Sequence, residues 1–391
     1  MTPYDIVTID GDGIGPEVCQ SAVTVLRQAC GSRLRFTPAD GGAAHYAKTG
    51  AVLPDDTYAA CHAAHAILHG AAGLPGITYA DGTEVGNDLH LRLRARLDLY
   101  ANVRPIKLYR GVSSPLAGWL AGQIDYVIVR ENTEGLYASR GAGVNLRDEL
   151  CTDTLVVTRK GVERVARFSF ELARSRAGAP RDGQRRVTVC DKANILKSYA
   201  FFRAVCTEVA AAYADVAIDY AYADAITVHL LKKPDFYDVI VTENMFGDIL
   251  SDLGAGTVGG LGIAASAELG DHHGLFQGAH GSAPDIAGQN LASPVATILS
   301  GALLLHWLAD RHGDAELRTA ALRVDRAVQD VLARGETVPR DLGGSARCSS
   351  RPPRCCRRRR SRRRRGFRCR RSLRRTRCRT WLPGAARRRV G

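Results

Sequence analysis

The chain has 391 residues, and its 45% apolar and 24% charged residues are typical of a globular protein with two domains or one large one. The first residues, MTPYDIVTIDGDG, are too short and too charged for a secretory signal, and no run of about 18 apolar residues could span a membrane. Six of the eleven cysteines are scattered through residues 1–346 without a CxxC pair, which predicts free thiols and a cytoplasmic location.

The net charge of +14 comes from one end of the sequence. Residues 347–391 contain 21 arginines and no Asp, Glu or Lys, so subtracting these 21 charges from +14 leaves −7 for residues 1–346. The predicted globular part is therefore mildly acidic, and nucleic-acid binding is not expected of it.

Short apolar runs rich in β-branched residues alternate with longer helical patterns along residues 1–346. This alternation predicts an α/β protein. The runs that predict strands are 4–9, 66–69, 100–103, 126–129, 154–157, 187–190, 216–220 and 239–242. The patterns that predict helices include 16–28, 162–175, 199–213, 244–253 and 295–311.

Two acids stand four residues apart in the helical pattern NMFGDILSDLGAG. Asp248 and Asp252 therefore project from one face of a helix, about one turn apart, where their charges repel. A solvated helix face is the ordinary explanation of such spacing. The apolar neighbours leave little of this helix for solvent, and that favours a Mg²⁺ or Mn²⁺ ion bound between the two carboxylates.

Several arginines stand at the ends of predicted strands. Arg94, Arg96 and Arg104 surround LDLYANVRP, and Arg130 ends the strand IDYVIVR. A guanidinium at a strand end is well placed to hold a carboxylate with two hydrogen bonds, although one such arginine is usually only a surface charge. Convergence of these arginines would indicate a ligand with several carboxylates.

Two further side chains have the chemistry of proton transfer. Lys192 follows a predicted strand beside Asp191, and Tyr137 lies in ENTEGLY. Lys192 is either a proton shuttle or a salt-bridged surface lysine, and Tyr137 is either a general acid or a surface ring. CHAAHAILHG brings Cys61, His62 and two more histidines together, but its spacing matches no closed zinc site.

Two loops rich in small residues could admit a cofactor close to the backbone. They are GDGIG at 11–15 and HGSAPDIAG at 280–288. The first loop is not a GxGxxG fingerprint, so a Rossmann dinucleotide site is not supported, and a tight turn from strand to helix is its simpler meaning.

Taken together, these stretches resemble the β-decarboxylating dehydrogenases, the isocitrate/isopropylmalate dehydrogenase family that also includes homoisocitrate, tartrate and D-malate dehydrogenases. The resemblance runs from about residue 4 to residue 344, with several long motifs in family order. The matching motifs are DGDGIGPEV (10–18), LRARLDLYANVRP (93–105), VRENTEGLY (129–137), DKANIL (191–196), TENMFGDILSDLGAGTVGGLG (242–262) and HGSAPDIAGQNLASP (280–294).

The resemblance implies the family's two-domain α/β fold, which is not a Rossmann fold. A large domain would be built from residues 1–99 and 259–346, and a small central domain would span residues 100–258 and carry a clasp between subunits. Residues 347–391 would then form an arginine-rich tail.

The resemblance also implies roles for individual residues. Arg94, Arg104 and Arg130 match arginines that bind substrate carboxylates, and Tyr137 and Lys192 match the catalytic pair. Asp224, Asp248 and Asp252 match the metal ligands, and in this family the lysine and one aspartate come from the partner subunit, which implies a homodimer. The residues that match the cofactor loop are His280, Gly281, Ser282, Ala283, Pro284, Asp285 and Ser293.

NAD is the implied cofactor, because NADP-dependent members have Lys and Tyr where this chain has Asp285 and Ile286. The chain departs from the family at Gln277-Gly278, where Glu-Pro is usual, and at Ser293, where an asparagine is usual. The implied activity is NAD- and Mg²⁺- or Mn²⁺-dependent oxidative decarboxylation of a small 2-hydroxy acid with a second carboxylate.

The identity of that acid stays open. RENTEG resembles the isocitrate, homoisocitrate and tartrate branches more than the isopropylmalate branch, which usually reads RELTGG. The helix that matches the family's substrate-reading helix has Asp88 and His90 where isocitrate enzymes typically have Ser and Asn. It has His90-Leu91 where isopropylmalate enzymes have paired leucines. His90 either contacts a polar substrate arm or is a solvated helix histidine.

Three hypotheses compete for residues 347–391. The tail binds nucleic acid or another anionic surface on an inactive dehydrogenase scaffold, or it is a disordered extension without function, or it is a frame-shifted translation of a GC-rich gene. Family members usually continue past DLGGSA into a closing helix, and the composition changes just after residue 346, which favours the frameshift. A second enzymatic alternative is metal-dependent decarboxylation without redox chemistry.

Overall fold

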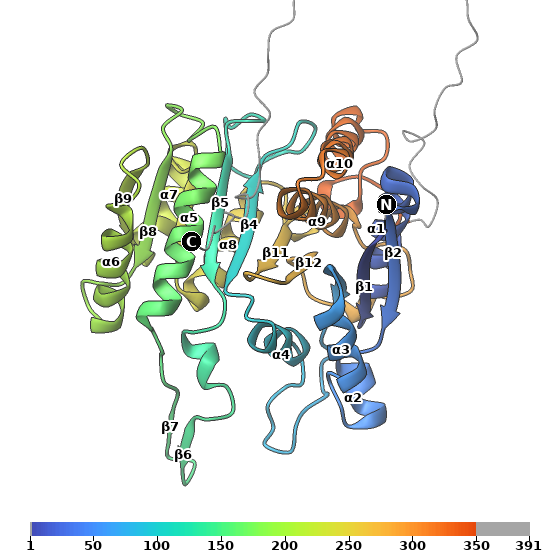
Figure 1. Cartoon of the computed structure of the whole chain (residues 1–391), viewed down its shortest axis with the longest axis horizontal. Coiled ribbons are helices and arrows are strands. Elements are labelled where there is room, and N and C mark those ends of the chain that lie inside the picture. Colours follow the sequence, from blue (N-terminus) through green and yellow to red (C-terminus); the bar gives the residue numbers. More distant parts are fainter. Residues whose placement is uncertain (1, 349–391) are drawn as a thin grey trace, which may run out of the picture.

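The computed structural model describes residues 2–348, which form an α/β structure around one ten-stranded sheet (Figure 1). The strands are β1 (Tyr4–Gly11), β2 (Leu34–Ala39), β3 (Ala66–Ala71), β4 (Ala101–Lys107), β5 (Asp125–Glu131), β8 (Arg186–Asp191), β9 (Ala217–Tyr222), β10 (Val239–Thr242), β11 (Ala265–Leu269) and β12 (Gly274–Gly278). A separate two-stranded sheet pairs β6 (Val144–Leu146) with β7 (Leu150–Thr152).

Ten α-helices connect these strands within the described part of the chain. They are α1 (Gly15–Cys30), α2 (Ala43–Thr49), α3 (Asp55–Ala63), α4 (Asp88–Arg96), α5 (Arg159–Ser175), α6 (Lys197–Ala210), α7 (Ala223–Lys232), α8 (Asn244–Thr257), α9 (Val295–His312) and α10 (Ala315–Arg334). Short 3₁₀ turns include η2 (Leu136–Ser139) and η5 (Pro284–Ile286).

The large sheet has the strand order β2-β1-β3-β12-β11-β4-β5-β10-β8-β9. The outer strands pair in parallel on both sides, whereas β12, β11, β4 and β5 pair antiparallel with one another. A parallel sheet with an antiparallel centre is not the Rossmann arrangement, which confirms the predicted fold class. Because β12 lies beside β3, a strand from late in the sequence completes the part of the sheet formed by the first strands.

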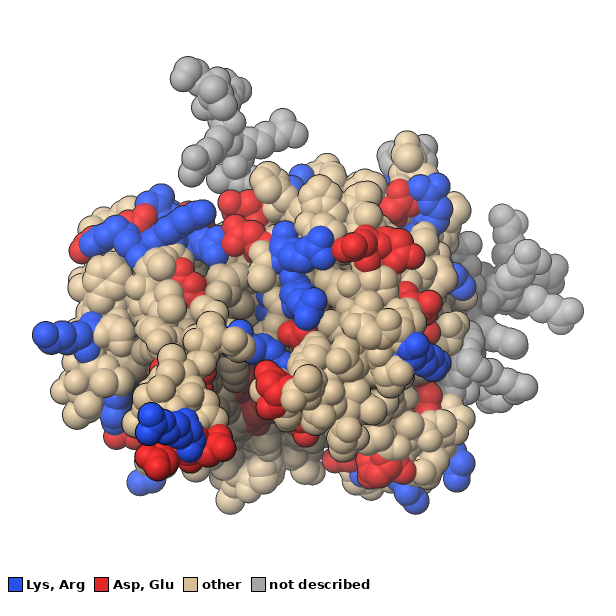
Figure 2. All heavy atoms as spheres, turned by 90° about the horizontal axis from the view of Figure 1, so that it is seen from below, with Lys and Arg blue, Asp and Glu red and all other residues tan. Residues whose placement is uncertain are grey.

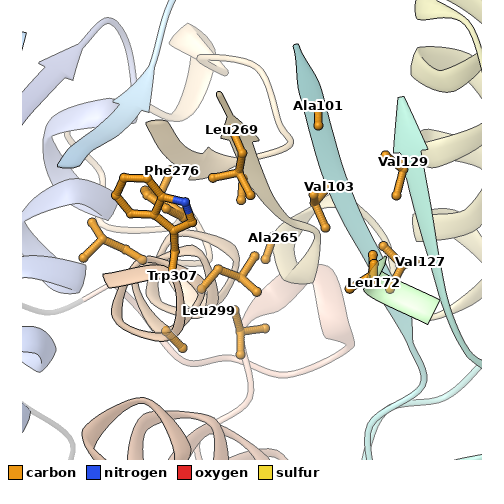
Figure 3. Close-up of a cluster of buried hydrophobic side chains, with 14 of the residues drawn as sticks. Ala101, Val103, Val127, Val129, Leu172, Ala265, Leu269, Phe276, Leu299 and Trp307 are labelled. Atoms are coloured by element: carbon orange, nitrogen blue, oxygen red, sulfur yellow. The ribbon is translucent and has the colours of Figure 1, made fainter. Parts of the chain in front are cut away.

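Side chains alternate between the two faces of the sheet, and one face is apolar across its full width. Val103 of β4, Val129 of β5 and Phe276 of β12 all point into this core, as Figure 3 shows. Helices α1, α5, α6, α9 and α10 cover the face, with Leu172 of α5 and Trp307 of α9 among the buried contacts. Helices from early (α1) and late (α9, α10) in the sequence therefore pack on one side of the same sheet.

The opposite face carries polar side chains in the middle of the sheet. Glu268 of β11, Asn102 of β4 and Arg130 of β5 stand opposite one another across neighbouring strands. To one side of this polar row an apolar cluster involves α4, and to the other side an apolar cluster involves α8. The polar row thus lies between two apolar clusters that hold helices α4 and α8 in position.

Local signals in the sequence set the ends of helix α8. Glu243 accepts hydrogen bonds from the backbone N–H groups of Met245 and Phe246, so its side chain caps the first turn. Glycines at 247 and 254 let the helix approach the sheet, since a Cβ at Gly247 would lie 2.5 Å from Cβ of Arg130. The carboxylates of α8 are thereby brought close to the arginine of β5.

The strand predicted at 154–157 is wrong. This stretch is a connection that makes one isolated bridge, between Val156 and Gly135, before α5 begins after its cap residue Thr158. The strand in this region is β7 instead, which pairs only with β6 in an arm whose residues are all exposed. Figure 1 shows the arm extending from the body of the molecule.

Candidate functional site

Arg104 of β4 and Arg130 of β5 both contact the acidic face of α8. Arg130 forms an ion pair with Asp248 and donates a hydrogen bond from Nε to Asn244 at 2.8 Å. Nη1 of Arg104 lies 3.4 Å from Asp252, and its Nη2 lies 3.6 Å from Asp248. The structure therefore brings together two of the predicted arginines and both acids of the DxxxD pair.

The two carboxylates of α8 differ in the environment that sets their pKa. Burial raises the pKa of Asp248, but Arg130, Arg104 and a hydrogen bond from Tyr137 outweigh it, so the pKa lies below its ordinary value. Burial raises the pKa of Asp252, and repulsion from Asp248 adds to this, with only partial compensation by Arg104. A cation between the two acids would relieve this repulsion, and carboxylate oxygens are the ligands that Mg²⁺ and Mn²⁺ prefer.

Tyr137 reaches the same carboxylate from the turn η2. Its hydroxyl donates a hydrogen bond of 3.0 Å to Oδ2 of Asp248, and its ring lies 5.3 Å from the guanidinium carbon of Arg130. Burial and the negative charge of Asp248 raise the pKa of Tyr137, although Arg130 opposes this. The phenol is therefore protonated at neutral pH, as a proton donor has to be.

Arg94 lies at the end of α4 and is 7% exposed. It forms a two-pronged pair with Glu268 of β11, with Nε donating at 2.8 Å and Nη2 at 2.7 Å. Burial lowers the pKa of Arg94, but Glu268 outweighs this, and the more distant Asp248 and Tyr137 act in the same direction. Arg94 thus borders the same group of side chains while its charge is already paired.

Lys192 and Asp224 form a separate pair. Lys192 follows β8, Asp224 lies in the first turn of α7, and their charged atoms are 2.8 Å apart. The Asp224 side chain is 70% exposed. Among residues 2–348 of one chain, no group of three or more His, Cys, Asp or Glu is placed to hold a metal ion, so Asp224 does not join Asp248 and Asp252 within a single copy.

The two loops rich in small residues pack against each other. Gly13 has a φ of +57°, and a Cβ there would lie 2.0 Å from the carbonyl oxygen of Ser282. Ile14 N–H donates to the same oxygen at 2.8 Å. Asp12 is 2% exposed and accepts three backbone hydrogen bonds, from Ala43, Ala44 and Gly73, each at 2.8 Å. The loop at 11–15 is therefore a rigid support for the loop at 280–288.

The predicted cofactor residues lie along that supported loop. Ala283 has a φ of +36°, and the turn η5 that follows leaves Asp285 exposed. Ser293 is 8% exposed and donates a hydrogen bond to the carbonyl of Gly262 at 3.0 Å. The loop thus presents Asp285 to solvent and keeps Ser293 inside. The others (His280, Gly281, Ser282 and Pro284) belong to the same segment.

The two residues of α4 that differ from the family pattern are both engaged by neighbours. Asp88 accepts hydrogen bonds from Tyr79 and Arg92 at 2.5 and 2.6 Å, and Arg140 lies 3.3 Å from it. His90 is not a solvated helix histidine, because it is 7% exposed and its Nε2 lies 3.2 Å from Nδ1 of His69. Burial lowers the pKa of His90, so the ring is neutral at neutral pH.

The other residues of CHAAHAILHG lie apart from one another. Cys61 is buried in α3, and His65 accepts a hydrogen bond from the backbone N–H of Asp5 at 3.0 Å. Arg96, one of the arginines around LDLYANVRP, stacks over the Tyr58 ring at 3.4 Å and does not join the other arginines.

Sequence reasoning missed several residues of the site. Asn244 orients Arg130, Ser251 accepts from Arg104 at 3.0 Å, and Glu268 holds Arg94. Of these three residues, only Glu268 could have been found from the sequence, because a carboxylate inside the apolar strand segment ASAEL requires a cationic partner when it is buried.

Figure 2 shows that acidic and basic side chains mix in the hollow between the two halves of the molecule.

The helices between residues 2 and 348 do not combine the length and apolar character that crossing a membrane requires.

Comparison with known proteins assigns the chain to a family. The family model described as isocitrate/isopropylmalate dehydrogenase matches residues 5–351. The chain is 45% identical to a 3-isopropylmalate/3-methylmalate dehydrogenase of Methanocaldococcus jannaschii, over 88% of this chain and 95% of that protein. It is 43% identical to a 3-isopropylmalate dehydrogenase of Corynebacterium glutamicum, over 81% and 91% of the two chains.

Solved structures agree with this result. An isocitrate dehydrogenase of Methylococcus capsulatus superposes with a TM-score of 0.77 at 37% identity, over 89% of this chain and 96% of that one. A β-decarboxylating dehydrogenase of Thermococcus kodakarensis superposes with a TM-score of 0.70 at 35% identity, over 89% and 93%. The chain therefore belongs to the isocitrate/isopropylmalate dehydrogenase family and is an NAD-dependent β-decarboxylating dehydrogenase.

Proposed function

We propose that the chain oxidises and decarboxylates a small 2-hydroxy acid with a second carboxylate, using NAD and a Mg²⁺ or Mn²⁺ ion. The observation that carries this proposal is the convergence of Arg104, Arg130 and Tyr137 on Asp248. The names of the curated relatives make 3-isopropylmalate the first substrate to test. RENTEG favours isocitrate, homoisocitrate or tartrate instead, so these acids and D-malate belong in the same assay.

Asp248 and Asp252 have the donor chemistry that a hard divalent cation requires, and Asp224 of a second copy would complete the set. When bound, the cation would lower the pKa of the substrate hydroxyl, and NAD would accept the hydride. Arg104 and Arg130 would hold the carboxylates of the acid in a fixed orientation. Both arginines are buried, so water competes little for these hydrogen bonds.

Proton transfer is assigned to two residues from different copies of the chain. Lys192 of one copy would take the proton of the substrate hydroxyl. Tyr137 of the other copy, protonated at neutral pH because its pKa is raised, would protonate the carbon that loses CO₂. The pairing of Lys192 with the exposed Asp224 supports this division, since the two residues can be presented together to a second copy.

A homodimer with shared sites is part of the proposal. The arm of β6 and β7 exposes Val144, Leu146 and Leu150, each at least half exposed. On α8, Ile249 is 57% exposed, although the sequence predicted a covered helix. Apolar side chains that are exposed in one copy are expected to be covered by the second copy.

NAD and a cytoplasmic location complete the proposal. Asp285 would accept hydrogen bonds from the ribose hydroxyls and would repel the 2′-phosphate of NADP. The loop at 280–288 would hold the cofactor against its backbone. The arginine-rich tail was predicted to span 347–391; its residues 349–391, with the nucleic-acid and frameshift hypotheses, lie outside the described residues.

The test is NADH formation by the purified protein with Mn²⁺ and the five acids named above. Turnover of one acid is expected, and EDTA or Asp248→Asn is expected to abolish it. Asp330→Asn, at an exposed position of α10, is the matched control and should retain activity. Release of CO₂ without NAD would support decarboxylation without redox chemistry. If folded, dimeric protein turns over none of the five acids, the proposal is contradicted.

A further inference from the structure

Lys192 and Asp224 leave the large sheet from neighbouring strand ends. β8 and β9 are the last two strands at one side of this sheet (Figure 1), and their parallel register pairs Asp191 with Tyr222, the final residue of each strand. Lys192 comes directly after Asp191, and Asp224 comes two residues after Tyr222. The two residues that the proposed function assigns to a second copy therefore depend on the same corner of the sheet.

Arg203 of α6 contacts both of these strand ends. Its Nε and Nη2 donate hydrogen bonds to the two carboxylate oxygens of Asp191 at 2.8 and 2.7 Å. Its guanidinium carbon lies 5.0 Å from the centre of the Tyr222 ring and 5.2 Å from that of Tyr220. One planar guanidinium thus binds the end of β8 through two hydrogen bonds and contacts the end of β9 through aromatic rings.

The carboxylate of Asp191 passes this restraint to the loop that carries Lys192. Asp191 is 0% exposed, and its Oδ1 also accepts a hydrogen bond from the backbone N–H of Ala193 at 2.8 Å. The carbonyl of Lys192 closes a turn by accepting from the N–H three residues later at 3.0 Å. The backbone around Lys192 is therefore held by Asp191, and Asp191 is held by Arg203.

The ion pair between Lys192 and Asp224 does not fix its own geometry. Their charged atoms are 2.8 Å apart, but the side chains are 26% and 70% exposed. An exposed pair of this kind contributes little to order, because water and salt compete with it. The placement of both side chains must then come from the backbone beneath them, and a displacement of about 1 Å at a reacting group can cost about 100-fold in rate.

We propose that Arg203 is a positioning residue that sets the relative placement of Lys192 and Asp224, and that it serves the site of the other copy and not the site of its own chain. The roles of Lys192 and Asp224 in this proposal rest on the proposed function. If Arg203 only neutralised the buried Asp191, its replacement would weaken the subunit without favouring either site.

Arg203→Lys keeps the positive charge beside Asp191 and removes the two-pronged geometry. We expect kcat to fall by about tenfold or more with little change in the KM for the acid. Arg174→Lys is the matched control, because Arg174 also pairs with an acid, Asp215, and lies 4.4 Å from the ring centre of Tyr213, before β9 begins. The control should retain its kcat. Full kcat in Arg203→Lys would overturn the proposal.

Mixed dimers decide which site Arg203 serves. Arg203→Lys is unfolded and refolded with Asp248→Asn, and separately with Lys192→Met. With Asp248→Asn, one site of the mixed dimer combines an intact Asp248 with a Lys192 held by an intact Arg203. If Arg203→Lys alone retains a tenth of the activity, this mixture should recover about a quarter of the wild-type value.

With Lys192→Met, every intact Lys192 belongs to an Arg203→Lys chain. This second mixture should therefore recover only about a twentieth of the wild-type activity. A residue that served the site of its own chain would give the reverse order, and a general loss of stability would lower both mixtures alike. Either of these results would overturn the proposal.

Acylation of lysines, followed by mass spectrometry, tests the positioning without turnover. A lysine that is held against a carboxylate is less available to N-acetoxysuccinimide than a free one. Without added metal, acylation of Lys192 should be about two- to fivefold faster in Arg203→Lys than in the wild-type protein, whereas that of the exposed Lys48 should not change. An unchanged rate at Lys192 in folded protein would also overturn the proposal.

Tyr222→Leu removes only the contact with β9 and is the second variant if Arg203→Lys does not fold. It should change the mixtures and the acylation of Lys192 in the same direction.

Failure of the proposed function can be recognised separately. If Lys192 is acylated faster in Arg203→Lys but the wild-type protein oxidises none of the acids, the proposed activity is wrong and the positioning by Arg203 stands. If Lys192→Met and Asp248→Asn restore each other but the Arg203→Lys mixtures do not differ as expected, the activity stands and the inference is wrong.

Discussion

Tyr137 and Asp248 share a hydrogen bond of 3.0 Å, which joins the proposed proton donor to the proposed metal ligand. The carboxylate also pairs with Arg130, so its two oxygens are held by different residues. Movement of either partner would change the orientation of the other. The phenol is thus positioned by the same acid that would bind the cation.

Removal of the Tyr137 hydroxyl should slow the chemical step and leave binding almost unchanged. Tyr137→Phe keeps the ring against Arg130 and deletes the proton donor, so kcat is expected to fall by about 100-fold or more while KM changes little. Tyr58→Phe, on the surface of α3, is the control. A variant that retains full kcat would remove Tyr137 from the mechanism.

If each site is built from two copies of the chain, two inactive variants should restore activity when they form a mixed dimer. Lys192→Met and Asp248→Asn should each be inactive alone. After the two proteins are unfolded together and refolded, a mixed dimer contains one site with an intact Lys192 and an intact Asp248. Random mixing should recover about a quarter of the wild-type activity. If the mixture stays inactive although mixed dimers are detected, each chain builds its own site.

Reversal of charge at position 285 should change the choice of cofactor. Asp285 is exposed within the loop at 280–288, the proposed cofactor loop, where it would repel a 2′-phosphate. The double change Asp285→Lys and Ile286→Tyr is expected to lower the preference for NAD over NADP by about 100-fold, measured as the ratio of kcat/KM values. Asp330→Asn, on the exposed side of α10, serves as a control with a charge change elsewhere. An unchanged ratio would place the ribose contact at another residue.

Glu268 should also make stability depend on pH in the acid range. The pKa of Glu268 is about 2 in the folded protein, against an ordinary value of 4.5. The ionised carboxylate therefore stabilises the folded protein above pH 4.5. This contribution, on the order of a few kcal/mol, is lost as the pH falls from 4.5 toward 2. Between pH 5 and pH 3, the free energy of unfolding measured with urea should decline less for Glu268→Gln than for the wild-type protein. Parallel declines would contradict the low pKa.

The parts of the fold that the sequence predicted are those with strong periodic patterns. The strand 239–242 has the predicted bounds, and α9 ends one residue beyond its predicted end. β2 was missed because Pro38 argues against a central strand, but β2 is at the sheet edge, where a missing N–H is tolerated. β11 and β12 were missed because alanine, serine and glycine replace the β-branched residues that usually mark a strand.

The candidate site was predicted unevenly for a similar reason. The DxxxD pair could be found because helical spacing reports which side chains share a face. The pairing of Arg94 with Glu268 joins positions 174 residues apart, and spacing cannot report it. The proposed contribution of Lys192 and Asp224 by a second copy is a matter of assembly, which no local pattern encodes.

The pairing of β3 with β12 has a consequence for synthesis of the protein. The free edge of β3 stays open until Gly274–Gly278 have left the ribosome, about 200 residues later. At usual translation rates this interval lasts about 10 to 40 seconds. Throughout it, the apolar side of α1 also lacks α9, its eventual neighbour. The first hundred residues of a nascent chain are therefore the segment most in need of a chaperone.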